Sequence, residues 1–333
     1  MNIKIKTLVS AITLASTFTV GVTTAMAADF TMRLTHQLPG SHHVAKAIES
    51  FAEEVRTSSD GRVDVDVFGG AQLFGPSQFH PAVARGQVEA ASIVSLSWGG
   101  TIPEMQVFGI PYLITGRQQL EAFPDSDAAA YLNKKFEERG VKNIGWLLDA
   151  NNAVVTSSGK PLIAPEDYRG IKIRGLSRIF DSGLIAMGAA PSTMPGSEVY
   201  QGLQTRVIDA AITSVGAAYS RRYFEVQEYG VASPLITVYQ NIVVNPGWWN
   251  SLPSDLQEVI STAAANAGRS LIPATDEVDP EGVATLEANG VKVTVLTPEQ
   301  INEIERVMRP AIVESFTEAV PDVDELITLI TQL

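Results

Sequence analysis

The chain has 333 residues, no cysteine and a formal net charge of −13 at pH 7. An acidic balance of this size argues against nucleic acid and anionic lipid as partners. Without cysteines there is no disulfide framework, so the hydrophobic core must stabilise the fold. A chain of this length favours two domains over one.

The N-terminus has the pattern of an export signal. Lys4 and Lys6 give it a basic start, residues 8–22 form a small apolar core, and Ala25-Met26-Ala27 supplies the small residues that a signal peptidase needs. We therefore expect cleavage after Ala27 and export to the periplasm. A transmembrane anchor is the alternative, but the apolar run is short, and no later stretch is long and apolar enough to span a bilayer.

The first half of the chain alternates predicted strands and helices. Residues 30–36 alternate apolar and polar side chains, as a half-buried strand does. From Val44 apolar residues recur at three- and four-residue steps, which predicts a helix that Asp60-Gly61 ends. Next come a strand over 63–68, a helix over 78–85, a strand over 88–94, a helix over 118–139 and a strand over 143–148. The strand over 88–94 is apolar on both faces and should be central. This alternation predicts parallel sheets with right-handed crossovers.

A polar break over residues 149–152 predicts a crossing into a second α/β unit. That unit should contain a strand over 171–174, helices over 177–187 and 197–203, and a strand over 207–213. The apolar stretch 236–244 predicts a strand that returns to the first sheet. From Pro253 the chain is helical to about Leu286, although Pro273 and Pro280 should bend or interrupt the helix. A strand over 291–295 and a helix over 299–316 follow.

The expected fold class is α/β, with two lobes joined by crossing strands and a long helix. Domain I would take residues 28–151 and about 237–278, and domain II residues 152–236 and about 279–333, with a ligand cleft between them. In open parallel sheets ligands bind beyond the carboxyl ends of the strands. Ser95, Arg174 and Thr213 all fall at the predicted carboxyl ends of strands. Their positions predict a ligand pocket at these strand ends.

Arg174 is the leading candidate for a ligand contact. It closes the β-prone run 171–173 and is followed at once by Gly175. A guanidinium at a strand end presents a planar set of donors that matches a carboxylate. A single arginine on a strand is usually solvated or ion-paired, so the surrounding pattern has to support the ligand role.

Several segments together resemble the substrate-binding proteins of tripartite ATP-independent periplasmic (TRAP) transporters, the DctP-like family. In chain order they are LTHQLPGSHHVAKAIESFAEEV, SSDGRVDVDVFGGAQLFG, IPEMQVFGIPYLI, YRGIKIRG, SEVYQGLQTRVIDAA and FEVQEYG. They cover nearly the whole mature chain, and the order and separation of the KIR and EVYQGLQ…VIDAA elements are specific.

The resemblance implies a two-lobed, type II periplasmic-binding-protein fold and a monomeric receptor that is not an enzyme. It further implies that a small organic acid is captured by lobe closure, that Arg174 receives its carboxylate, and that the loaded form docks on the membrane permease subunits. Uptake would be driven by an ion gradient, since nothing in the chain matches a nucleotide-binding motif.

Three positions differ from the sialic acid binders of that family. Val154 stands where those proteins have a second arginine, Thr213 where they have an asparagine, and Gly196 where they have an aromatic residue. These differences favour a small, singly charged acid over a large polyhydroxylated acid held by two arginines.

Further candidate ligand residues lie mostly in the first lobe. They are Gln37, Gln78, Ser95, Ser97, Trp98, Thr213 and Tyr239. Gln37 follows a strand and matches a family position that faces the cleft. Trp98 either stacks on the ligand or is a half-buried ring with no ligand contact.

Other classes of function have weaker support. His42-His43, with His36 and His80, lack the spacing of a zinc site, so no metal is expected, and no cofactor either. GxSxG and HExxH patterns are absent, which argues against a secreted hydrolase, although paired carboxylates for glycoside cleavage stay open. A binder of a small amine, zwitterion or sulfonate with the same fold, and a periplasmic sensor, are the remaining alternatives.

Overall fold

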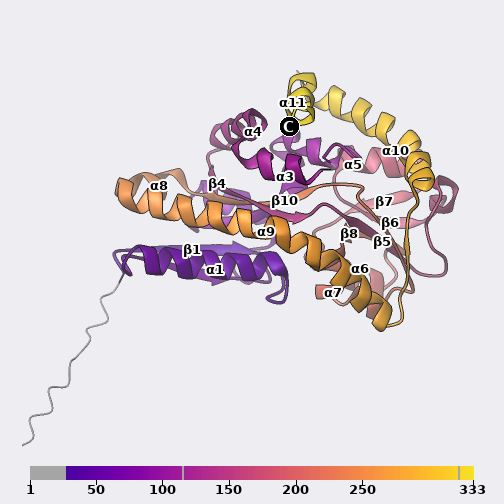
Figure 1. The fold of residues 1–333 in the computed structure, drawn as a ribbon, viewed down its shortest axis with the longest axis horizontal. Coiled ribbons are helices and arrows are strands. Elements are labelled where there is room, and N and C mark those ends of the chain that lie inside the picture. Colours follow the sequence, from indigo (N-terminus) through magenta and orange to yellow (C-terminus); the bar gives the residue numbers. More distant parts are fainter. Residues whose placement is uncertain (1–27, 115, 322) are drawn as a thin grey trace, which may run out of the picture.

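Two β-sheets organise the chain into two α/β lobes (Figure 1). The computed structural model describes residues 28–114, 116–321 and 323–333, so the predicted export signal lies outside the described residues. Helices pack against each sheet, because each sheet has an apolar face to bury. The α/β fold class with two lobes is confirmed.

The first sheet has the strand order β2-β1-β3-β10-β4. Its strands are β1 (Phe30–His36), β2 (Val63–Phe68), β3 (Ala90–Val94), β4 (Lys142–Ala150) and β10 (Val238–Val244). β1 is parallel to β2 and β3, whereas β10 is antiparallel to β3 and β4. The central place of β3 and the return of β10 to this sheet are both as the sequence predicts.

The second sheet has the order β11-β9-β5-β8-β6-β7. Its strands are β5 (Ala153–Ser157), β6 (Lys172–Gly175), β7 (Ala190–Thr193), β8 (Ala210–Ser214), β9 (Tyr229–Ser233) and β11 (Lys292–Val295). Sequence reasoning missed β5, β7 and β9. β5 follows β4 after two residues and begins directly after the presumed crossing, and the short, mostly exposed β7 has no apolar period.

The prediction of purely parallel sheets is wrong for both lobes. β10 is antiparallel in the first sheet, and β5 is antiparallel to β8 and β9 in the second. Both strands cross directly from one lobe to the other. A strand that enters a sheet in this way starts at the edge where the parallel strands end, so it runs against them, whereas a parallel partner needs a long crossover connection.

Most of the helices lie where the 3.6-residue period predicts them, but the short helices over 215–220 and 323–331 were not predicted. They are α1 (His43–Ser58), α2 (Phe79–Ala84), α3 (Arg117–Ala122), α4 (Asp127–Glu138), α5 (Arg178–Ala186), α6 (Gly196–Gln204), α7 (Val215–Ser220), α8 (Pro246–Ser251), α9 (Ser254–Ala288), α10 (Pro298–Ala319) and α11 (Val323–Thr331). The single helix predicted over 118–139 is in fact α3 and α4. A 3-10 turn with Pro124 separates them, and the Ser126 hydroxyl caps α4 by accepting from the Ala129 N–H at 3.2 Å.

α9 connects the two lobes. It packs on α1 and β4 of the first lobe and on α7 and β11 of the second, and Figure 1 shows it running across both. Pro273 and Pro280 lie inside the helix without interrupting it. None of the helices in the described ranges is long and apolar enough to cross a membrane.

Polar contacts tie the crossing segments to their surroundings. The Thr237 hydroxyl, beside β10, donates to Asn151 Oδ1 at 2.8 Å, and Asn152 Nδ2 donates to Asp279 Oδ2 of α9 at 2.7 Å. At the C-terminus α10 packs on α5, but α11 packs on α4 of the first lobe. The last helix therefore contacts the first lobe, although the predicted division assigned it to domain II; that division stays a prediction.

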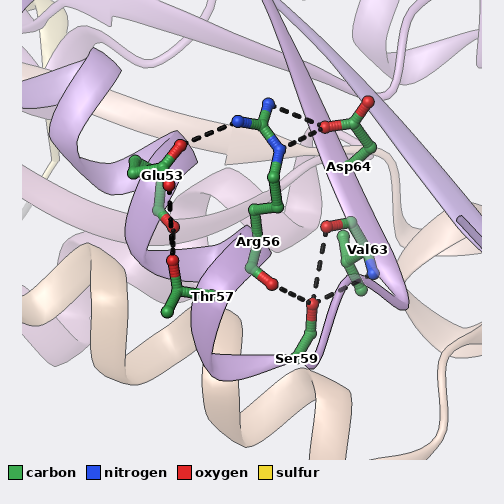
Figure 2. Close-up of polar contacts among 6 residues, drawn as sticks. All are labelled: Glu53, Arg56, Thr57, Ser59, Val63 and Asp64. Atoms are coloured by element: carbon green, nitrogen blue, oxygen red, sulfur yellow. Dashed lines mark hydrogen bonds and ion pairs between the residues drawn. The ribbon is translucent and has the colours of Figure 1, made fainter. Parts of the chain in front are cut away.

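The connection between α1 and β2 shows how local polar groups orient the first lobe (Figure 2). The Arg56 guanidinium pairs with Glu53 on its own helix at 2.7 Å and with Asp64 on β2 at 2.8 Å. The Ser59 hydroxyl accepts from the Val63 N–H at 3.1 Å. The helix is thereby held to the strand that follows it.

Candidate functional site

Two neighbouring cavities, which share lining residues, lie between the lobes. The outer cavity has a volume of about 580 Å³ and the inner one about 50 Å³. Both are lined by Leu96 and Ser97 from the first lobe and by Arg174 and Leu176 from the second. The carboxyl ends of β3 and β6 therefore meet at one cavity, as expected for the ends of strands in an α/β sheet.

Backbone carbonyls hold the Arg174 guanidinium in place. Nε donates to Met194 O at 3.3 Å, and Nη1 donates to Ile212 O at 2.7 Å. Among the described residues, no carboxylate oxygen lies within 4.0 Å of this guanidinium. Burial lowers the pKa of Arg174 to about 10, so the side chain is still charged at neutral pH. A desolvated charge without a counter-ion is costly, and an anionic ligand would offset that cost.

A second arginine lies at the same inner cavity. Arg221 follows α7 and lines the inner cavity together with Arg174. Its guanidinium lies over Gly196, where an added Cβ would be 3.0 Å from Nη1 and 3.1 Å from Cζ. The expectation of one arginine at the site is therefore wrong. Val154 is fully buried in β5, and the second cation comes from a different element.

The back wall of the inner cavity is built around Asp149, the penultimate residue of β4. Its carboxylate accepts from the Ser214 hydroxyl at 3.1 Å and from Gln240 Nε2 at 2.8 Å. Burial alone would raise the pKa of Asp149, but the neighbouring histidines, the Gln240 amide and Arg221 outweigh it, so the pKa lies below its usual value. The wall thus holds a charged carboxylate.

Two amide oxygens in this wall have no donor. The Oε1 atoms of Gln37 and Gln240 are buried and have no hydrogen-bond partner within the described part of the chain. The orientation of Gln240 follows from its Nε2 contact with Asp149, so its Oε1 is an acceptor. Both oxygens are therefore available to accept a hydrogen bond from a donor in the cavity.

His42, His43 and Asp149 form the one cluster in the described residues with ligand atoms close enough for a metal, within 4.8 Å of one another. The hydrogen bonds favour another arrangement. His42 Nδ1 accepts from the Val44 N–H at 3.3 Å, so the proton of the neutral ring is on Nε2, 3.7 Å from Asp149 Oδ1. A metal at that nitrogen would require the proton on Nδ1 and would remove this helix cap.

The structure places four predicted ligand residues on the cavity walls. They are Gln37, Ser97, Arg174 and Thr213. Ser95 and Gln78 lie elsewhere. The buried Ser95 hydroxyl accepts from the Tyr239 N–H at 3.2 Å, and Gln78 Oε1 accepts from the Gly75 N–H at 3.3 Å to cap its own turn. Both side chains have local structural roles.

Trp98 and Tyr239 lie in the first-lobe core and do not line the cavities. Each is 1% exposed. The Trp98 ring packs at 4.9 Å from Phe136, and the Tyr239 ring packs at 5.1 Å from Phe123. The reason is side-chain direction, because successive residues of a strand point to opposite faces. Gln240 faces the cavity, so Tyr239 faces the core, and a ligand contact for either ring has no support from the geometry.

Sequence reasoning missed three residues of the site. They are Asp149, Arg221 and Gln240. Asp149 lies in the polar break over residues 149–152. That break was interpreted only as a crossing, so Asp149 was given no chemical role. Arg221 stands beside Arg222 in an unremarkable SRRYFE segment, and nothing local separates the two. A polar Gln240-Asn241 pair inside an apolar strand was the one usable signal.

Two α/β lobes on crossing strands, with a charged arginine in the cavity between them that has no carboxylate partner in the described part of the chain, are typical of a two-lobed solute-binding protein. Comparison with known proteins agrees. Residues 34–319 match the DctP family, "Bacterial extracellular solute-binding protein, family 7". The chain belongs to this family.

Individual relatives are distant but cover most of the chain. A solute-binding protein of Albidiferax ferrireducens is 27% identical over 86% of this chain and 86% of its own. The C4-dicarboxylate-binding periplasmic protein DctP of Rhodobacter capsulatus is 26% identical over 73% of each chain. A TRAP periplasmic solute-binding protein of Rhodoferax ferrireducens, solved with bound malonate, has a TM-score of 0.85 at 25% identity and covers 90% of this chain and 97% of its own.

Proposed function

We propose that this protein is the receptor of a TRAP transporter and captures a small organic acid between its lobes. The observation that carries the proposal is Arg174, a charged guanidinium that backbone carbonyls orient into the cavity and that lacks a carboxylate partner among the described residues. Relatives named for dicarboxylate binding, and one solved with malonate, support an acid as the ligand.

Capture follows from the geometry of the crossing strands. A carboxylate that enters the cleft forms charge-assisted hydrogen bonds with the part of the Arg174 fork that the backbone leaves free. The lobes then close about the crossings near Asn151 and Thr237, water leaves the cavity, and the lower dielectric strengthens those bonds. The closed, loaded form is the one that docks on the membrane permease.

The remaining parts of the proposal concern location and state. The export pattern that ends at Ala27 and the periplasmic relative support a periplasmic protein whose signal peptide is removed. The permease subunits are its protein partners, and we propose that it acts as a monomer and has no catalytic activity. A hydrolase with this fold would turn over ligands that bind, so product analysis after incubation with each binding acid tests that last point.

The direct test is Arg174→Ala. Calorimetry with an acid identified in a thermal-shift screen should show a loss of about 2–4 kcal/mol of binding free energy, because a buried carboxylate loses its paired charge. Arg306→Ala is the matched control, since Arg306 is exposed on α10 and lines neither cavity. Unchanged affinity in Arg174→Ala, with the fold intact, would refute the anchor role.

A zwitterion is the second candidate ligand, and the back wall supports it. Asp149 is a buried carboxylate at the inner cavity, and the free oxygens of Gln37 and Gln240 need donors. An ammonium group would satisfy these acceptors while a carboxylate met Arg174. A screen that pairs each amino acid with its 2-hydroxy acid separates the candidates, since a preference for the amine should disappear in Asp149→Asn.

A further inference from the structure

We propose that Asp181 is a positioning residue for the ligand anchor: its carboxylate holds the two chain segments that direct the Arg174 guanidinium into the cavity. This inference rests on the proposed capture of an acid by Arg174 and adds a residue to that mechanism. Asp181 lies on α5 and lines neither cavity, so it acts through Arg174 and not on the ligand.

The two carboxylate oxygens of Asp181 hold different segments. Oδ1 accepts from the N–H of Leu176, which lies two residues after Arg174, at 3.0 Å. Oδ2 accepts from the hydroxyl of Thr193, the last residue of β7. The next residue, Met194, supplies the carbonyl to which Arg174 Nε donates at 3.3 Å. One carboxylate therefore fixes the chain just after the arginine and the chain just before the carbonyl that orients it.

Local helix structure does not account for this carboxylate. Asp181 is 6% exposed and lies on α5 beside the core residues Ile179, Phe180 and Leu184. Burial raises its pKa, although its hydrogen bonds lower it. The N-terminus of α5 does not need it as a cap, because the Ser177 hydroxyl already accepts from the Phe180 N–H at 3.2 Å. A buried carboxylate is costly unless its hydrogen bonds offset the desolvation, and these bonds lead to the Arg174 turn and to β7.

The Asp181 carboxylate does not compete with a ligand for Arg174. Its two oxygens are used by Leu176 and Thr193, and within the described part of the chain no ion pair joins it to the guanidinium. The backbone contacts of Arg174 use Nε and Nη1, so Nη2 stays available for an incoming carboxylate. The guanidinium is thus held from behind while one side of its fork faces the cavity.

The experiment measures the affinity of Asp181 variants by calorimetry, with an acid that binds the wild type. Asp181→Ala removes both hydrogen bonds and should weaken binding about 10- to 100-fold, because the guanidinium is no longer held in place. Asp181→Asn can accept from the Leu176 N–H through its oxygen and donate to the Thr193 hydroxyl through its nitrogen, so its affinity should stay within about threefold of wild type. An equal loss in both variants would overturn a role that depends on these two bonds.

Two further variants separate positioning from a general loss of structure. Thr193→Val removes only the link to β7 and should weaken binding about three- to tenfold, which keeps the proposal testable if Asp181→Ala does not fold. Ser182→Ala is the matched control on the same helix. The Ser182 hydroxyl donates to Ala311 O of α10 at 3.0 Å, away from the Arg174 turn, so its loss can lower stability but should leave the affinity unchanged.

A double-mutant cycle tests whether Asp181 acts through Arg174. In an Arg174→Ala background, neither Asp181→Ala nor Thr193→Val should change the remaining affinity by more than about twofold, measured by thermal denaturation at high acid concentrations. Equal losses in both backgrounds, or unchanged affinity in folded Asp181→Ala, would overturn the positioning role while Arg174 remains the anchor. If Arg174→Ala binds the acid as tightly as the wild type, the proposed function fails and the inference fails with it.

Discussion

The carboxylate of Asp181 lies directly against the Cα of Gly175, so closely that a Cβ there would be 2.2 Å from both of its oxygens. This carboxylate accepts from the Leu176 N–H at 3.0 Å and from the Thr193 hydroxyl at 2.5 Å. It thereby closes the turn between β6 and α5, immediately after Arg174. The glycine that follows Arg174 is thus required by packing.

Gly175→Ala should therefore disturb the anchor without touching the ligand. The methyl group would displace Asp181 or the turn, so we expect a loss of about 1–3 kcal/mol of stability and a weaker acid affinity. Urea denaturation and calorimetry measure the two effects. Gly40→Ala is the control, because nothing lies within 4 Å of a Cβ at that position. Equal stability of the two variants would contradict the packing argument.

Acidification should destabilise the fold, because two buried histidines stay neutral in the folded protein while the same residues take up protons in the unfolded chain. Burial lowers the pKa of His36 to about 4 and that of His42 to about 3, against about 6.5 in the unfolded chain. Between these values the unfolded chain binds more protons, so stability is full above about pH 6.5 and falls as the pH drops toward the folded pKa. Each histidine should cost about 1.4 kcal/mol per pH unit, measured by urea denaturation from pH 7 to 5.

His42→Asn removes one of these two titrating side chains, so the contribution of His42 to the pH dependence of stability can be measured. Asparagine keeps an acceptor for the Val44 N–H and removes the titration, so the slope between pH 6 and 5 should decrease by about 1.4 kcal/mol per unit. Burial raises the pKa of Asp279 to about 6, which gives a contribution of opposite sign in this window, but it is common to both proteins. An identical slope in wild type and variant would contradict the assignment.

Tyr239→Phe should stabilise the protein and leave ligand affinity unchanged. The Tyr239 hydroxyl is buried without a hydrogen-bond partner in the described ranges, and its ring packs among Phe108, Phe123 and Trp146. Removal of an unpaired buried hydroxyl should add about 1 kcal/mol to the free energy of unfolding. Thermal denaturation and calorimetry check the two halves, and a loss of affinity would show that the hydroxyl reaches the ligand.

The local periods of the sequence were sufficient for most elements of the fold. β1, α1 and β2 lie where the apolar spacing predicts them, because each buries one face against its immediate neighbours. The direction of β10 could not be predicted in this way. Its antiparallel pairing depends on which lobe the chain comes from. The spacing of apolar residues along a strand carries no information about that direction.

For the site, the sequence by itself determined that an arginine, followed by a glycine, stands at the end of a strand. The tertiary structure decided what surrounds that arginine. Arg221, Asp149 and Gln240 come from three separate elements, and only their assembly at the crossing puts two cations and an anion on one cavity. The same assembly placed Tyr239 in the core, because the face that a side chain of a strand occupies is set by the packing of its whole sheet.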